Sequence, residues 1–345
     1  MYILTLNRMK KYLLSLLAVC FAVAAIAEEK AEPSAWNCSG VLGLNASATG
    51  LVNWAAGGSN NVTGVAFGKV RLLYNENNLS WETNLDMEYG MSWIDQEYDP
   101  FQKSSDKLNF NTKFGWQFHK AWYLTAAAGF KSQLAYGRSY DGTNADDPII
   151  SKFLSPSYTD ISVGIDWKPN SIFSIYLSPV AGQITTAFVG DAVEEQHPGL
   201  RQQLQEKYAT WAYSKEMNED GTYDKIYKNY KAELGLTLKG AINYTYKDLK
   251  IITSVGLFTP YAWDKTRMFD AEENFIGYRD NNRRFGNFDV DWDAAISYQF
   301  LKCLNVTLST SLKYYNGVKI ANAEGILAER VQFKGTLGLG VGYSF

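Results

Sequence analysis

Beyond its first 27 residues the chain has no long apolar run, which excludes a helical membrane protein, because a spanning helix needs about 20 apolar residues in succession. The chain also has no large excess of charge of one sign. A net charge of −3 and a pI near 5.6 leave no polybasic surface for nucleic acid. Histidine is scarce, since His119 and His197 are the two in the chain. Catalysis by an imidazole base therefore has few possible locations.

Cysteine is scarce as well, with three residues in the whole sequence. Cys20 lies in an N-terminal segment that we expect to be removed, which leaves Cys38 and Cys303. An oxidising cell envelope permits a disulfide between them, but they fall on strands that we expect not to be adjacent. The sequence leaves open whether they form a bridge or remain two separate thiols.

Aromatic residues are abundant, at 15% of the chain, although the mean hydropathy of −0.24 is that of a soluble protein. A membrane β-barrel reconciles the two values. Its strands alternate apolar and polar residues, which hides the lipid-facing side chains from an average, and its aromatic girdles lie at both bilayer interfaces.

The N-terminus has the three parts of a secretory signal. Arg8, Lys10 and Lys11 form a basic region, residues 13–25 are apolar, and Ala25-Ile26-Ala27 is a small-x-small cleavage site. We therefore expect a signal peptide at 1–27, followed by one barrel domain at 28–345. A retained anchor is disfavoured by the short apolar run, and a lipoprotein by Val19 before Cys20.

The C-terminus alternates without a break from Val331 to Phe345. Odd positions are mostly apolar and include Tyr343, whereas even positions are polar or glycine, so one face of a strand suits hydrocarbon and the other water. A chain that ends on such a strand with an aromatic residue resembles the closing strand of bacterial outer-membrane β-barrels.

The same period of two recurs most clearly at 79–93, 108–118 and 288–300. Weaker repeats predict nine further strands, at about 40–53, 62–75, 121–137, 154–168, 171–187, 229–247, 248–263, 303–316 and 328–345. Twelve is an even number, as a single-chain bacterial barrel requires. The fold class predicted is all-β, a transmembrane antiparallel barrel of about twelve strands.

Short and long connections alternate strictly between these strands. The short ones are 76–78, 119–120, 169–170, 247–248 and 302–303, and the long ones are 54–61, 94–106, 138–153, 188–228, 264–284 and 317–327. Short periplasmic turns and long extracellular loops are typical of such barrels, whereas a soluble β-sandwich, the alternative fold, does not need this asymmetry.

The longest loop, at about 188–228, contains the one helical pattern. Leu200, Leu204, Tyr208 and Trp211 recur at helical spacing on an otherwise charged segment, which predicts a short amphipathic helix. It could cover the barrel mouth, enter the lumen, rest on the outer leaflet or remain a solvated excursion.

Charged residues of both signs are predicted to point into the lumen. They are Glu82, Asp86, Glu88, Asp160, Asp166, Asp289, Asp291, Asp293, Lys69, Arg71, Lys113, Lys131, Lys239, Lys313 and Lys334. Such charges either pair into a network that fills a small barrel or line a narrow aqueous path.

Asp289, Asp291 and Asp293 are the densest acidic group, and carboxylates are ligands that calcium prefers. Ala294 and Phe300 stand where an EF-hand loop needs glycine and glutamate, so we favour pairing with lumen cations and predict no metal and no cofactor. A catalytic Ser/His pair like that of twelve-stranded outer-membrane phospholipases is not evident either. His119 is predicted at a periplasmic turn and His197 lies in an external loop.

Three local motifs are similar to those of an uncharacterised family of Bacteroidetes outer-membrane barrels, a domain of unknown function. They are Asn53-Trp54-Ala55-Ala56-Gly57-Gly58, Phe153-Leu154-Ser155-Pro156 and Tyr176-Leu177-Ser178-Pro179-Val180-Ala181-Gly182. The resemblance covers nearly the whole mature chain and implies location and fold, but no substrate and no catalytic residue. Physically, Gly57 and Gly58 permit φ > 0, Trp54 suits an interface, Pro156 begins a strand, and Pro179 predicts a bulge or an edge-like site.

The role expected from these features is a passive or gated conduit for small solutes or apolar molecules in the bacterial outer membrane. A structural or adhesive barrel with a sealed lumen, and a lipid-modifying enzyme, are the alternatives. Expected partners are outer-membrane lipids and lipopolysaccharide, the barrel assembly machinery and periplasmic chaperones, and an unknown small solute, but no nucleic acid.

Overall fold

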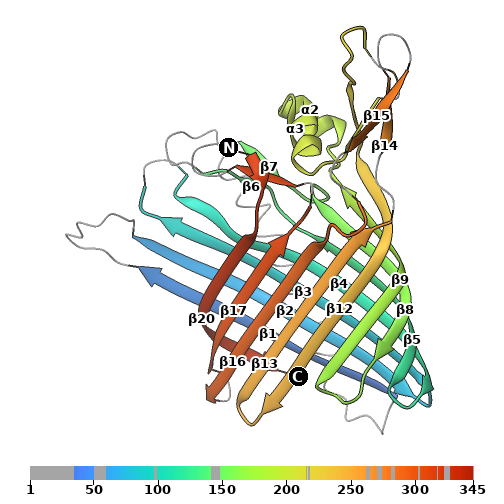
Figure 1. Ribbon diagram of the computed structural model, residues 1–345. Helices are drawn as coiled ribbons and strands as arrows, with labels where there is room; N and C mark the ends of the chain where they lie inside the picture. Colours follow the sequence, from blue (N-terminus) through green and yellow to red (C-terminus); the bar gives the residue numbers. More distant parts are fainter. Residues whose placement is uncertain are drawn as a thin grey trace.

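A computed structural model describes residues 35–49, 60–96, 99–140, 148–214, 216, 218–261, 265–269, 274–280, 284–301, 304–316, 318–321 and 327–344. Twelve antiparallel strands close into one barrel, each paired with its neighbours in sequence order (Figure 1). In that order they are β1 (Trp36–Thr49), β2 (Asn61–Glu76), β3 (Leu79–Ile94), β4 (Phe101–His119), β5 (Trp122–Ser132), β8 (Ser157–Trp167), β9 (Phe173–Thr186), β12 (Tyr230–Tyr246), β13 (Leu249–Pro260), β16 (Asp289–Leu301), β17 (Leu304–Tyr314) and β20 (Gln332–Ser344). The fold class and the number of strands predicted from the sequence are confirmed.

The alternation of side chains is the physical basis of this closure. Large apolar side chains such as Trp81 on β3, Phe114 on β4 and Leu337 on β20 are exposed on the outer surface, at the positions predicted to face lipid. Ladder partners share a face, so the pairing of Trp81 with Phe114 and of Glu82 with Lys113 assigns odd positions of β3 outward and even positions inward. Among the described helices, none is long and apolar enough to cross a bilayer.

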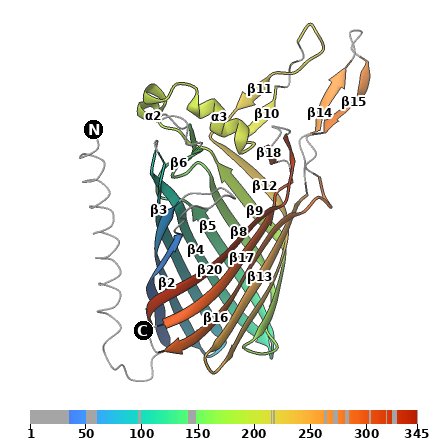
Figure 2. The ribbon, with the colours of Figure 1, turned by 90° about the vertical axis from the view of Figure 1, so that its left-hand side faces the viewer.

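The two ends of the barrel differ in the length of their connections. One end, the turn end, has the tight links 77–78, 120–121, 168–172 and 247–248. The other, the loop end, has the links 95–100, 133–156, 187–229, 261–288 and 315–331. The first strand begins and the last strand ends at the turn end, as Figure 2 also shows.

Several small elements stand beyond the loop end. The link 187–229, here called the cap, holds α2 (Asp191–Gln196), α3 (Leu200–Lys207) and the hairpin of β10 (Trp211–Tyr213) with β11 (Lys225–Tyr227). The link 133–156 holds β6 (Gly137–Arg138) and β7 (Ile149–Ser151). Two more hairpins are β14 (Lys265–Phe269) with β15 (Phe275–Asp280), and β18 (Lys319–Ala321) with β19 (Leu327–Glu329).

Two sequence predictions at this end are corrected. Trp211 does not continue the helical stripe but begins β10, because α3 ends at Lys207 and Ala209 follows with a positive φ of 54°. The predicted strand 121–137 ends at Ser132, where the chain leaves the barrel wall to form the link 133–156.

The bulge predicted at Pro179 is present in β9. The register shifts there on both sides, because Val163 pairs with Val180 whereas Ile165 pairs with Leu177. The Ser178 hydroxyl lies 2.8 Å from the carbonyl oxygens of both Val163 and Val180, so it compensates for the ladder hydrogen bonds lost at the bulge.

Glycine is required opposite this bulge on the neighbouring strand. A Cβ atom on Gly164 would lie 2.1 Å from the carbonyl oxygen of Leu177. The close approach of the two backbones therefore excludes any larger residue at this position.

The join between the last and first strands is the shortest in the barrel. Residues 41–45 of β1 pair with residues 340–344 of β20, giving five Cα partners, whereas each of the other joins has at least ten. Within the described backbone, residues 46–49 of β1 pair only with β2, and residues 332–339 of β20 pair only with β17. The two strands thus meet near the turn end and diverge toward the loop end (Figure 2).

Candidate functional site

The lumen is the candidate site, because the predicted charged residues lie on its wall. Ion pairs between strands separated by a third strand require both side chains to point inward, as Lys239 on β12 and Asp160 on β8 do at 2.9 Å. The ladder registers assign the remaining predicted charges to the same face, namely Lys69, Arg71, Glu82, Asp86, Glu88, Lys113, Lys131, Asp166, Asp289, Asp291, Asp293, Lys313 and Lys334.

A contact across the lumen joins two nearly opposite walls. Lys131 on β5 and Asp291 on β16 come from the fifth and tenth strands of the twelve, and their charged atoms lie 3.4 Å apart. Lys313 on β17 lies 3.7 Å from the same carboxylate, and the Tyr315 hydroxyl donates to it at 2.8 Å. Asp291 is thus the centre of a bridge near the loop end.

Two tyrosines make a second contact across the lumen. Tyr158 on β8 and Tyr315, which directly follows β17, stack with ring centroids 5.6 Å apart and an interplanar angle of 17°. Together with the Asp291 contacts they form what we call the cross-lumen bridge, made of Lys131, Tyr158, Asp291, Lys313 and Tyr315. It connects the β5–β8 wall to the β16–β17 wall.

A separate group of charges lies toward the turn end. The Asp166 carboxylate is fully buried and lies 2.5 Å from the Lys113 amine and 3.3 Å from the Lys168 amine. The Lys113 amine also lies 4.9 Å from the centroid of the Tyr176 ring. Arg71 pairs with Glu82 at 2.8 Å on the neighbouring wall. These pairs line the wall rather than cross the lumen.

The luminal cations keep part of their side-chain surface exposed. The side chains of Arg71, Lys107, Lys113, Lys131, Lys239 and Lys313 keep between 29% and 46% of their surface exposed. A lumen filled by a charged plug would bury them almost completely, so the arrangement is a lined and bridged lumen rather than a solid core.

The predicted charges are not all paired. Asp86 pairs with Lys107 at 2.5 Å, and the Ser105 hydroxyl donates to Glu88. Lys69, Asp293 and Lys334 have no ion-pair partner within the part of the chain that the structure describes. The network is therefore partial, which leaves cations available to other groups.

The cap covers the lumen from above and closes a small pocket against it. The pocket is lined by Tyr208 of the cap, by residues from the loop ends of β8, β9, β12 and β16, and by the link after β17. Besides Tyr208 they are Tyr158, Gln183, Thr185, Lys231, Glu233, Asp289, Tyr315, Asn316 and Val318. Burial raises the pKa of Tyr208, whose hydroxyl donates to the carbonyl oxygen of Ile150 at 2.8 Å.

The cap shares an apolar core with β7 of the link 133–156. Ile149, Val189, Leu200 and Leu204 are buried against one another, and Val193 and Tyr208 pack on them. The helical stripe predicted from Leu200, Leu204 and Tyr208 is confirmed as the face that forms this core. Of the positions left open for the loop, the structure selects the one over the barrel mouth (Figures 1 and 2).

The segment Phe153-Leu154-Ser155-Pro156 fastens the cap to the barrel rim. Ser155 is fully buried, and its hydroxyl donates to the carbonyl oxygen of Phe188 at 2.8 Å, as does the amine of Lys152. The carbonyl oxygen of Leu154 accepts the Phe188 amide at 3.1 Å. Pro156 follows in a cis peptide and directly precedes β8. The motif therefore has a structural role at the base of the cap.

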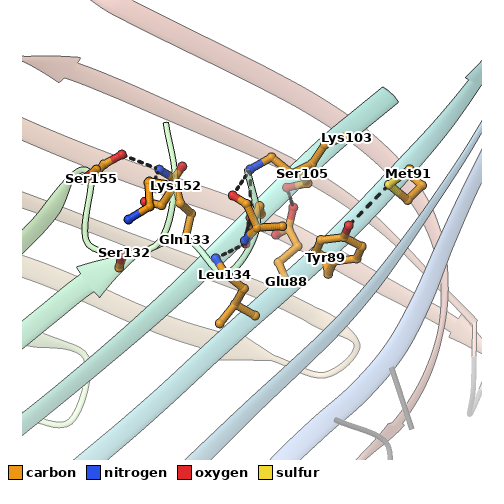
Figure 3. Close-up of polar contacts among 12 residues, drawn as sticks. Glu88, Tyr89, Met91, Lys103, Ser105, Ser132, Gln133, Leu134, Lys152 and Ser155 are labelled. Carbon is orange, nitrogen blue, oxygen red and sulfur yellow. Dashed lines mark hydrogen bonds and ion pairs between the residues drawn. The ribbon is translucent and has the colours of Figure 1, made fainter. Parts of the chain in front are cut away.

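The link 133–156 is held to the outer rim by a buried ion pair. Asp106 accepts the backbone amides of Leu134 and Ala135, each at 2.8 Å, and pairs with Lys103 at 2.9 Å. Its side chain is 2% exposed. Figure 3 shows this region together with Gln133, which donates to the carbonyl oxygen of Ser155 at 3.0 Å. This anchor could not be predicted from the sequence, because Asp106 lies in the predicted loop 94–106.

Several residues and segments singled out in the sequence lie outside the described part of the chain, and others show no arrangement suited to catalysis or metal binding. The signal peptide, Asn53, Trp54, Gly57, Gly58, Cys303 and Phe345 lie outside them, while Tyr343 lies in β20. Cys38 is a free, exposed cysteine on β1. Among the described residues, no three histidine, cysteine or acidic side chains gather as a metal site would require. His119 ends β4 at the turn end, and His197 follows α2 in the cap.

The tyrosines of the bridge and pocket were missed by the sequence analysis. Tyr158 alternates with Thr159 and Ile161 in β8, so its parity with Asp160 places it in the lumen. The alternation in β8 therefore indicates a luminal Tyr158, although only charged residues were assigned to the lumen from the sequence. Tyr208 was predicted as part of a helical stripe, but its position over the lumen depends on tertiary packing.

A comparison with protein families and solved structures adds the following. Residues 46–137 match the model of a family described as a protein of unknown function (DUF3078). This match covers the end of β1 and the strands β2 to β5, and gives no activity. No curated protein matches the chain.

Solved outer-membrane proteins are similar to the chain in outline. An outer membrane channel from Pseudomonas putida F1 has 9% identity and a TM-score of 0.38 over 92% of this chain and 98% of that one. The translocator domain of the autotransporter NalP from Neisseria meningitidis has 9% identity and a TM-score of 0.36 over 98% of both chains. The NanC porin has 9% identity and a TM-score of 0.33 over 88% and 97%. The assignment of fold therefore rests on the closed barrel itself.

Proposed function

We propose that the chain is exported to the bacterial outer membrane, spans it with the turn end in the periplasm, and acts as a gated conduit for small solutes or apolar molecules. The apolar outer face supports the location, because exposed tryptophan, phenylalanine and leucine side chains on every part of a barrel wall suit only hydrocarbon. The longer links at the other end then face outward, as in other such barrels.

One observation carries the conduit role. The lumen is polar and solvated along its wall, yet it is obstructed at the loop end by the cross-lumen bridge and the cap. The bridge consists of side-chain contacts, and the cap is a loop that packs on the link 133–156, so both can open without breaking the barrel ladder. The described conformation is thus the closed state of a gate.

The gate is tested by conductance of the purified protein in planar bilayers. Deleting residues 190–228 together with Lys131→Ala and Tyr158→Ala removes both obstructions, and we expect single-channel conductance to rise several-fold over the wild type. The matched control is Lys69→Ala, which removes a luminal cation that takes no part in the bridge. If neither protein conducts and neither admits arabinose into liposomes, the conduit role is wrong.

A second candidate role, adhesion, is favoured by one feature. The β14–β15 hairpin projects beyond the rim (Figures 1 and 2), and its residues Phe275 and Ile276 are more than half exposed. Exposed apolar residues on a projecting hairpin suit contact with a partner. Binding of cells to surfaces that depends on these two residues, without any conductance, would favour adhesion over transport.

A further inference from the structure

The open part of the β1–β20 join exposes two backbone edges to the bilayer. Residues 46–49 of β1 and 336–339 of β20 would be ladder partners if the register of the paired part continued, since Asn45 pairs with Gly340. They are not paired. Backbone amides and carbonyls without partners are highly unfavourable in hydrocarbon, so this part of the join must either close or receive a polar group from outside the barrel wall.

The two faces of the open join differ in character. On the outside, Leu44, Leu337 and Leu339 are 66%, 71% and 62% exposed, which suits acyl chains. On the inside, the side chain of Asn45 faces Gly338 and Gly340, so no bulky luminal side chain obstructs the passage there. An apolar outer surface and a polar, unobstructed inner wall are the surroundings that an amphiphile requires.

A free cation stands at the loop end of the same edge. Lys334 points into the lumen from β20, its side chain is exposed, and no described residue forms an ion pair with it. The luminal cations of the neighbouring wall, such as Lys313, are already engaged with Asp291. Lys334 is therefore positioned to receive an anionic headgroup at the level of the outer rim.

The cross-lumen bridge separates this region from the pocket under the cap. The bridge runs from β5 and β8 to β16 and β17, so the pocket walls β9 and β12 lie on one side, and β20 with β1 to β4 on the other. A molecule that enters through the join therefore reaches the lumen without passing the cap.

We propose that the loop-end half of the β1–β20 join is a lateral portal through which an amphiphile with an anionic headgroup passes between the outer leaflet and the lumen, with Lys334 contacting the headgroup. This proposal rests on the proposed conduit role and names its substrate class. The acyl chain lies along Leu337 and Leu339, and the headgroup crosses between the two strand edges, where it takes hydrogen bonds from unpaired amides.

The portal is tested by locking it. Ala46→Cys with Leu339→Cys places two thiols on opposite edges of the open part, in a background of Cys38→Ser and Cys303→Ser. Ala66→Cys with Tyr89→Cys, at the paired β2–β3 join, is the matched control. Each protein is compared with itself, oxidised and reduced, in liposomes that hold albumin. The probe is a fluorescent lysophosphatidic acid, whose charged headgroup keeps it from crossing the lipid alone.

We expect oxidation to reduce capture of the probe at least fivefold in the portal variant and not in the control. Entry of arabinose, measured by swelling, should persist in both. If the probe still enters after complete cross-linking, the portal is wrong while the conduit stands. If neither probe nor arabinose enters any variant, including the cap deletion, the conduit itself is wrong. Cross-links between two copies of the chain would also overturn the portal, because the edges would then serve self-association.

A measurement without cross-linking provides an independent check. A photoactivatable lysophosphatidic acid should label peptides containing residues 332–340 more than those of the β2–β3 join, and equal labelling would contradict the portal. Lys334→Gln should lower capture of the phosphate probe several-fold but leave a monoacylglycerol of the same chain length unchanged. An equal loss for both probes would mean that Lys334 acts on the barrel rather than on the headgroup.

Discussion

Leu204 is a fully buried side chain at the centre of the cap core, and its truncation should release the cap while leaving the barrel intact. Leu204→Ala removes methyl groups packed against Ile149, Val189 and Leu200. Buried leucine-to-alanine changes cost about 2–5 kcal/mol, and a core of only four buried residues can partly collapse, so we expect the lower end, about 2–3 kcal/mol. At 1.4 kcal/mol for each factor of ten, the population of released cap should rise roughly 30- to 150-fold.

Limited proteolysis of the folded barrel measures this change, because cleavage of a transiently open segment follows its open population when reclosing is fast. We expect the rate of cleavage within 187–229 to rise by that factor, with the barrel fragment unaffected. Leu234→Ala, which truncates a leucine on the outer face of β12 at 55% exposure, is the control. Equal cleavage rates for the two variants would refute the idea that this core holds the cap in place.

Three further predictions concern the anchor at Asp106, the bulge in β9 and the charge of Lys207 in the cap. Asp106→Asn should free the link 133–156, since charged hydrogen bonds to the two backbone amides contribute about 1.5–3 kcal/mol each, and faster hydrogen exchange at Leu134 would show it. Unchanged exchange there would contradict the anchor. Ser178→Ala should lower the free energy of unfolding in urea by about 1–3 kcal/mol, because two carbonyl oxygens at the bulge lose their donor, whereas Ser174→Ala, on the same strand, should have a smaller effect. Burial lowers the pKa of Lys207, so the docked cap disfavours the charged amine, and protease resistance should increase as pH rises through that lowered pKa toward the ordinary lysine value. Lys207→Met should remove this trend, and a trend that persists in that variant would assign it to another group.

The alternation of side chains made the barrel predictable in advance. Each strand carries its own evidence for which residues face lipid, so Trp81, Phe114 and Leu337 were assigned outward from parity alone, and the structure agrees. Short turns such as 77–78 fixed the strand count, because a two-residue link permits only an antiparallel neighbour.

The partners of luminal charges could not be predicted in the same way. Parity assigns Lys131 and Asp291 to the lumen but does not bring the fifth and tenth strands face to face, since that depends on the tilt and diameter of the closed barrel. The anchor at Asp106 was missed for a related reason, because a carboxylate that binds loop amides leaves no periodic signal. The local sequence pattern determines which face of a strand a residue occupies, whereas the closure of the barrel determines which luminal residues contact one another.

The hydrogen bonds from Ser155 and Lys152 to Phe188 tie two loops that belong to different hairpins. For anyone who wishes to display a foreign peptide on this protein, that tie divides the surface into permissive and forbidden sites. An insertion next to residue 155 or 188 would shift one loop against the other and disturb both. The strands β14 and β15 form a two-stranded hairpin of their own, so a guest sequence inserted between them would leave the mouth of the barrel undisturbed.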